Sequence, residues 1–174
     1  MVTDAIWSDY NSDGKVDLIV VGEYMSPQIF ESKKSSWENV SKEIFGKQDS
    51  LSGFWNCIVT GDFNKDNLPD YALGNLGLNT RYKASPQYPL EIYANDFDNN
   101  QSLDVITGFY RNEKLVPVKQ LNTFKSRLNG FSKRYYKYAD FAKASIFDMF
   151  DNELLKKGFH AKVQTTASIV LLSQ

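Results

Sequence analysis

Three short segments of the sequence carry carboxylate or amide side chains at the same four offsets, in the pattern D-x-[DN]-x-[DN]-x-x-x-D. The side chains are Asp9, Asn11, Asp13 and Asp17; Asp62, Asn64, Asp66 and Asp70; and Asp96, Asp98, Asn100 and Asp104. Oxygen ligands at alternate positions of a tight loop, with a backbone carbonyl near position 7, suit Ca²⁺. Those carbonyls belong to Lys15, Leu68 and Ser102. A solvated turn would explain one such loop, but three in one register predict up to three calcium sites.

The residues around these loops predict strands rather than helices. An EF-hand needs a bidentate glutamate at position 12, where this chain has Val20, Leu73 and Thr107. The flanking segments, such as TDAIWSD and VDLIVVG around the first loop, are rich in β-branched and aromatic residues. Each unit is therefore predicted to be a β-hairpin whose turn closes around an ion.

Two of these units resemble a known family of repeats. The segments AIWSDYNSDGKVDLIVVGEY and CIVTGDFNKDNLPDYALGNLG resemble the FG-GAP/VCBS blades of β-propellers, the class found in integrin α-chain heads. The stretch GNLGLNTRYKASPQYPLEIYANDFDNNQSLD is similar to a subgroup in large secreted or surface proteins of Bacteroidota. The resemblance covers about residues 3–120. It implies a propeller fold with one Ca²⁺ per loop, and no particular enzyme activity.

The spacing of the loops, which begin at residues 9, 62 and 96, sets the expected organisation. We expect a mainly β protein, a partial β-propeller of about three blades in one fragment over residues 1–174. The expected boundaries are about 3–52 for blade one, 53–89 for blade two and 90–174 for blade three, with a helical insertion near 120–158. Because propellers close with at least four blades, we expect the remaining blades to belong to a longer parent chain.

The residue at position 6 ranks the three loops. That position favours a positive φ, which Gly14 adopts without strain, Asn67 tolerates and Gln101 adopts least readily. We therefore expect the first loop to be the best formed and the third the poorest.

Other residues that carry chemistry are few. His160 is the only histidine and Cys57 the only cysteine, so a Ser/His/Asp triad or a zinc site has little to build on. We expect His160 to have a structural role and Cys57 to be a small buried side chain. The three tryptophans, Trp7, Trp37 and Trp55, are expected in the core.

The charge pattern bears on the kind of partner. A net charge of −1 gives no strong attraction to nucleic acid or to an anionic membrane, and no apolar run has the length of a membrane span. The basic and aromatic stretch over residues 125–138 is expected to form an amphipathic helix with solvated cations. We therefore expect neither nucleic-acid binding nor membrane insertion.

Two classes of function remain open. The first is a non-catalytic, calcium-binding module or scaffold within a larger secreted or cell-surface protein, with a protein or glycan as its ligand. The alternative is a calcium-dependent, glycan-active enzyme such as a polysaccharide lyase, in which Arg81, Tyr82 or Lys83 would remove a proton beside a metal-bound uronate. Because solvated loop cations explain these residues equally well, we expect the binding module and assign no catalytic residue.

Overall fold

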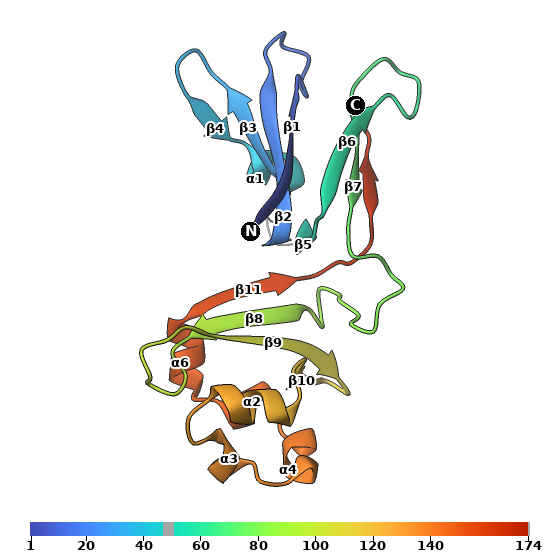
Figure 1. Cartoon of the computed structure of the whole chain (residues 1–174). Coiled ribbons are helices and arrows are strands. Elements are labelled where there is room, and N and C mark those ends of the chain that lie inside the picture. Colours follow the sequence, from blue (N-terminus) through green and yellow to red (C-terminus); the bar gives the residue numbers. More distant parts are fainter. Residues whose placement is uncertain (47–50, 174) are drawn as a thin grey trace. The chain divides into compact units, whose positions relative to one another are not determined.

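The computed structural model describes residues 1–46 and 51–173, which fold into two compact units. Unit 1 contains residues 1–87 together with the C-terminal segment that begins at Lys162. Unit 2 contains Tyr88–Ala161. Antiparallel sheets dominate both units (Figure 1), so the expectation of a mainly β protein is confirmed.

The first sheet of unit 1 is built around the first predicted loop. Its strands are β1 (Val2–Ser8), β2 (Asp17–Met25), β3 (Gln28–Ser32) and β4 (Trp37–Asn39), in that order, and β5 (Gly53–Phe54) pairs with β2. A short helix, α1 (Ser41–Phe45), follows β4. Along β2, buried residues such as Ile19 and Val21 alternate with half-buried ones, as the period of a strand requires. β1 and β2 are thus the two arms of a hairpin that the first loop closes.

The second sheet of unit 1 is built around the second loop. It consists of β6 (Cys57–Gly61), β7 (Asp70–Gly74) and β12 (Ile169–Leu171), with β7 in the middle. The two sheets bury one core between them. Its fully buried side chains are Ile19, Val21, Ile29, Val40, Trp55, Ile58, Tyr71 and Leu73.

Unit 2 contains the third loop in a sheet of its own. The strands are β8 (Leu90–Asn95), β9 (Asp104–Arg111), β10 (Lys114–Pro117) and β11 (Phe159–Val163), in the order β10-β9-β8-β11. β9 and β10 join through Asn112 and Glu113, both at positive φ (48° and 63°). Two left-handed residues are the geometry of a tight hairpin turn.

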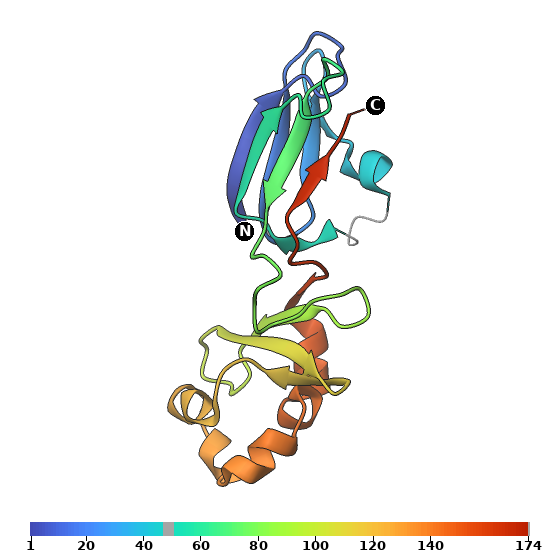
Figure 2. The ribbon, with the colours of Figure 1, turned by 90° about the vertical axis from the view of Figure 1, so that its right-hand side faces the viewer.

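Five short helices cover one face of this sheet (Figures 1 and 2). They are α2 (Leu121–Arg127), α3 (Phe131–Arg134), α4 (Tyr138–Lys143), α5 (Ile146–Met149) and α6 (Asn152–Lys157). An aromatic cluster that includes Phe124, Phe131 and Phe150 packs them against Ile106 and Leu115 of the sheet. The helical segment predicted near 120–158 is therefore present. In the part of the chain that the structure describes, no helix has the length and apolarity needed to cross a membrane.

The pairing of β12 differs from the expected blade boundaries. The last strand was expected in a third blade over residues 90–174, but it pairs with β7, from Ile169 opposite Leu73 to Leu171 opposite Tyr71. Unit 2 is therefore inserted in the chain between two strands of unit 1. The physical reason is that β7 would otherwise leave a row of unpaired backbone groups at a sheet edge. The spacing of the loops carries no information on this pairing, because the two strands lie far apart in sequence.

Three side chains that were expected to be buried are exposed. Trp7 and Trp37 are 60% and 50% exposed, and their rings contact each other on the first sheet with centroids 5.5 Å apart. Cys57 is exposed on β6. Strand alternation explains this result, since Ile58 points into the core and its neighbour must point outward. Of the three tryptophans only Trp55 is fully buried.

Candidate metal centres

All three predicted loops adopt the same backbone conformation. Positions 4 and 6 have positive φ in every copy: Ser12 and Gly14 (58° and 81°), Lys65 and Asn67 (66° and 67°), and Asn99 and Gln101 (59° and 67°). This region is unfavourable for residues with a Cβ, so bonds within each loop must hold it. Gln101 has a positive φ as Gly14 does, but a side chain there is strained where glycine is not, so the ranking of the loops stays a prediction.

The aspartate at position 1 organises each loop. Its two carboxylate oxygens accept the N–H groups of positions 5 and 6. The distances are 3.0 and 2.9 Å to Asp9, 3.1 and 3.0 Å to Asp62, and 3.0 and 2.7 Å to Asp96. Burial opposes the ionisation of Asp96, but these N–H donors outweigh it and lower the pKa of that carboxyl group. A carboxylate oxygen that accepts one such bond still has a lone pair for a cation.

The side chain at position 5 closes the second half of each turn. Its Oδ1 atom accepts the N–H group of position 7, at 2.8 Å from Lys15 to Asp13, 2.8 Å from Leu68 to Asp66, and 2.7 Å from Ser102 to Asn100. The position-7 residues, whose carbonyls are predicted ligands, are therefore held in place by the position-5 side chains, which are predicted ligands of the same ion.

The third loop brings its carboxylates closest together. Oxygens of Asp96, Asp98 and Asp104 lie within 4.8 Å of one another, the one such group of three among residues 1–46 and 51–173. Asp98 Oδ2 accepts the N–H of Asn129 at 2.6 Å, whereas its buried Oδ1 has no hydrogen-bond partner among the described residues. Burial, followed by repulsion from Asp98 and Asp96, raises the pKa of Asp104. A divalent cation would remove this repulsion.

In each of the first two loops, a neighbouring side chain contacts the carboxylate at position 5. Lys15 Nζ lies 2.7 Å from Asp13 Oδ2, and its hydrogen bond lowers the pKa of Asp13. In the second loop, Asn64 Nδ2 donates to Asp66 Oδ2 at 2.7 Å. Exposed ion pairs are weak, so the Lys15–Asp13 contact competes weakly with a divalent ion.

The aspartate at position 9 is fully buried in the first two loops. Asp70 has both oxygens engaged, Oδ2 by the N–H of Phe63 at 2.8 Å and Oδ1 by the N–H of Ser173 at 3.0 Å. Asp17 Oδ1 accepts the N–H of Ser32 at 2.8 Å, but its buried Oδ2 has no hydrogen-bond partner in the described chain. An unpartnered buried carboxylate oxygen is costly. Asp98 belongs to the group of three carboxylates that fits a hard cation such as Ca²⁺, and a cation would also satisfy the orphan oxygen of Asp17.

A second polar cluster, not indicated by the sequence motifs, lies in unit 2. Glu91 is 4% exposed and accepts hydrogen bonds from the hydroxyls of Tyr93 (2.6 Å) and Tyr110 (3.3 Å). His160 Nε2 lies 2.7 Å from the same carboxylate, and the imidazole stacks on Tyr93 with centroids 4.4 Å apart. Burial, and then Glu91, raise the pKa of both tyrosines. The sequence signal for this cluster is a glutamate at an inward position of a strand.

The residues named for the enzymatic alternative make local contacts. The guanidinium of Arg81 lies 5.9 Å from the ring centroid of Tyr82, and Lys83 Nζ donates to the carbonyl of Leu78 at 2.5 Å. Within the residues that the structure describes, no ion pair joins Arg81 or Lys83 to a loop carboxylate. The structure therefore assigns these cations no shared site with the loops.

The three β-hairpins with the same acidic turn indicate a repeat protein. The comparison with family models also finds a repeat in this chain. Residues 9–73, which include the first two loops, match the model of the FG-GAP-like repeat. The match supports the FG-GAP family for this part of the chain, and it ends before the third loop. No curated protein and no solved structure gives a match to the chain.

Proposed function

We propose that this chain is a calcium-binding repeat module of the β-propeller type, and that it acts as a non-catalytic binding or scaffold part of a larger secreted or surface protein. Each of the three loops would hold one Ca²⁺ through the side chains at positions 1, 3, 5 and 9 and the carbonyl of position 7. The ion would supply the positive charge that the clustered carboxylates need.

One observation carries this proposal: the same turn geometry occurs three times in the chain. Two copies lie in the FG-GAP-like match, and the third repeats their φ pattern and hydrogen bonds outside it. A chance acidic turn would not reproduce left-handed residues at positions 4 and 6 together with an aspartate that accepts two N–H groups. The repetition supports the view that all three loops meet the same structural requirement. The simplest such requirement is to supply oxygen ligands to a cation.

The exposed faces of unit 1 support a place within a larger propeller. Trp7 and Trp37 lie on the exposed face of the first sheet, and Val59 and Val170, each 54% exposed, lie on that of the second. Blades of a propeller cover such faces with their neighbours. We propose that further blades of a longer parent chain cover these faces, and that loops at the blade ends contact a protein or glycan ligand.

Extracytoplasmic calcium levels suit sites of this kind. Calcium sites of extracellular modules have dissociation constants of about 10⁻⁴–10⁻³ M, and the weakly competing contacts in the first two loops are compatible with that range. A secreted or surface location is therefore part of the proposal. No observation favours the lyase alternative, since in the described residues no ion pair joins Arg81 or Lys83 to a carboxylate of the loops.

Thermal unfolding in calcium and in EGTA tests the proposal. Because an ion that binds only the folded chain stabilises it by RT ln(1 + [L]/Kd), each site should add about 2.7 kcal/mol at a hundredfold excess over Kd. We expect a higher midpoint in calcium, and no such gain in a variant with Asp9→Asn, Asp62→Asn and Asp96→Asn. An unchanged midpoint of the wild-type chain would show that the loops are not structural calcium sites.

A further inference from the structure

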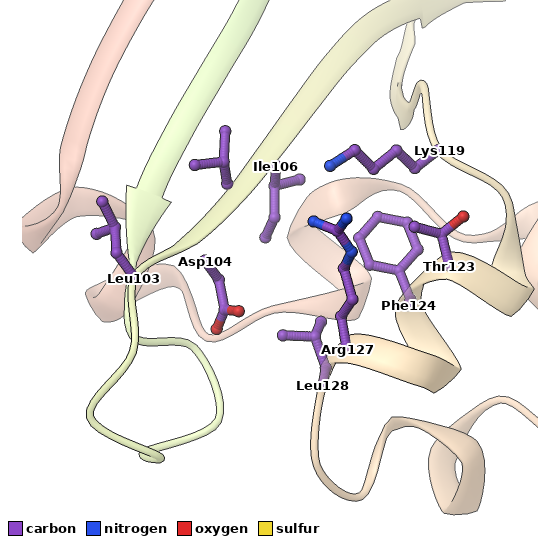
Figure 3. Close-up of a pocket in the computed structure, with 9 residues that line it drawn as sticks. Leu103, Asp104, Ile106, Lys119, Thr123, Phe124, Arg127 and Leu128 are labelled. Carbon is purple, nitrogen blue, oxygen red and sulfur yellow. The ribbon is translucent and has the colours of Figure 1, made fainter.

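Unit 2 contains a small pocket between the start of β9 and helix α2 (Figure 3). Its volume is about 100 Å³. Since one water occupies about 30 Å³ of the liquid, this is room for about three waters or for one small polar group of a ligand. Its wall is formed by apolar side chains, among them Ile106, Phe124 and Leu128, together with polar ones.

Two cations converge in this pocket. Figure 3 shows the guanidinium of Arg127 and the ammonium of Lys119 pointing toward each other beside the ring of Phe124. No ion pair of the described chain includes either side chain. Like charges that point toward each other repel, so an anion between them would be favourable.

The one carboxylate in the pocket is oriented elsewhere. Asp104 Oδ2 accepts the N–H group of Phe97 at 3.1 Å, a bond that belongs to the third loop. In Figure 3 the carboxylate of Asp104 points away from Lys119 and Arg127. Asp104 therefore closes the acidic loop, and the two cations are left to face the pocket.

Helix α2 and the residues just before it bring these groups to the pocket. Thr123 and Arg127 are four residues apart on α2 and so lie on one face of the helix, and Lys119 precedes the N-cap residue Gln120. Helix α2 is fixed in the core by Leu121 and Phe124, which are 0% and 4% exposed, and Phe124 also lines the pocket. Thr123 and Arg127 are thus attached to a rigid base, as a binding site requires.

We propose that this pocket binds an oxyanion: a carboxylate, sulfate or phosphate group carried by a small ligand. The guanidinium of Arg127 offers paired N–H donors that match two oxygens of such a group, and Lys119 adds a compact positive charge. Thr123 contributes a hydroxyl at the same wall. The site lies outside the FG-GAP-like match and uses no predicted calcium ligand other than Asp104 as a lining residue.

The test is a titration of the isotope-labelled chain with sodium glucuronate, sulfate and phosphate, followed by amide NMR in EGTA at constant ionic strength. We expect saturable shifts confined to the pocket residues, with at least one of the three anions in the millimolar range. Arg127→Gln and Lys119→Gln should each weaken binding about tenfold, because each removes a charge-assisted hydrogen bond. The anion that binds most tightly identifies the source of the oxyanion.

Lys133→Gln is the matched control, because Lys133 is an exposed cation of unit 2 that does not line the pocket. This variant should bind as the wild type does. Shifts that do not saturate with any anion, or equal losses in Lys133→Gln and Lys119→Gln, would overturn the proposal. Because Arg127 is exposed, its replacement should leave the amide spectrum dispersed, which separates loss of binding from loss of folding. The titration in EGTA also keeps this result independent of calcium.

Discussion

At the scale of single residues, position 5 offers a matched comparison of charge. Asp13 and Asn100 occupy this position in the first and third loops, and each accepts the N–H of position 7 at 2.8 and 2.7 Å. The two side chains have similar size and the same backbone contact, and they differ in whether the oxygen carries a charge. A cation should therefore interact more strongly with Asp13 than with Asn100.

We predict that Asp13→Ala lowers the free energy of unfolding in calcium more than Asn100→Ala does. The ion should bind the charged oxygen of Asp13 more strongly than the neutral oxygen of Asn100, so a difference between the two losses is expected in calcium. Urea unfolding at saturating calcium measures it, and in EGTA the two losses should converge. Lys15→Ala is the control for the exposed Lys15–Asp13 pair.

The opposite ranking would have a clear meaning. The carboxylates of Asp96, Asp98 and Asp104 already lie within 4.8 Å of one another. If Asn100→Ala is the more damaging change in calcium, then the gathered carboxylates of the third loop outweigh the glycine of the first, and Gln101 carries little strain.

At the scale of elements, helix α5 depends on its first turn. Ser145 Oγ accepts the N–H of Asp148 at 3.2 Å, and Asp148 Oδ2 accepts the N–H of Ser145 at 2.8 Å, which is a capping box. The backbone hydrogen bond from Ser145, followed by its side-chain bond, lowers the pKa of Asp148. A helix of one turn has few other bonds, so this cap has a large share in holding it.

We predict that Asp148→Asn destabilises the chain in a pH-dependent way. Because the pKa of Asp148 is lower in the folded state, its charge stabilises the fold above the ordinary carboxyl pKa of about 4, and this gain is lost as the pH falls through the folded value. The wild type and the variant should therefore differ at neutral pH and converge in acid. Ser145→Ala, which removes the other half of the box, should cost about 0.5–2 kcal/mol. A wild-type-to-variant difference that stays constant from neutral pH to acid would show that the charge of Asp148 plays no part.

The sequence predicts local elements better than it predicts their partners. Hairpin arms, acidic turns and the helical segment follow from patterns within a few residues, as the hairpin of β1 and β2 around the first loop illustrates. The exposure of Trp7 cannot be predicted from such a pattern. When a strand has apolar residues on both faces, its sequence does not indicate which face packs against the core. The same holds for the Glu91 cluster, whose members meet only when β8 and β11 lie in one sheet.

At the scale of the whole molecule, the chain leaves unit 1 after β7 and returns to it in β12. The loops of the two sheets in unit 1 share one hydrogen-bond contact. The aspartate at position 9 is held by a backbone N–H from a third strand or its end, by Ser32 for Asp17 and by Ser173 for Asp70. β12 thus has the place in the second sheet that β3 has in the first. Loop spacing misses this equivalence because the third strand follows an insertion.

The connectivity predicts that unit 1 folds without unit 2. We expect a variant with residues 88–161 replaced by a flexible Gly/Ser linker to unfold cooperatively, because the core shared by the two sheets contains no residue of the insertion. Its calcium-dependent gain in midpoint should come from two loops instead of three. Thermal unfolding in calcium and in EGTA measures both properties.

The matched control is a second variant that ends at residue 87 and so lacks β12 as well. We expect it to lose cooperative unfolding, because the edge of β7 is then unpaired and Asp70 loses the N–H of Ser173. Ile169 and Leu171, which pack against the core of unit 1, are also removed. If this shorter chain is as stable as the one that keeps β12, the last strand is not part of the second sheet in solution. In that case unit 2 is a C-terminal extension rather than an insertion.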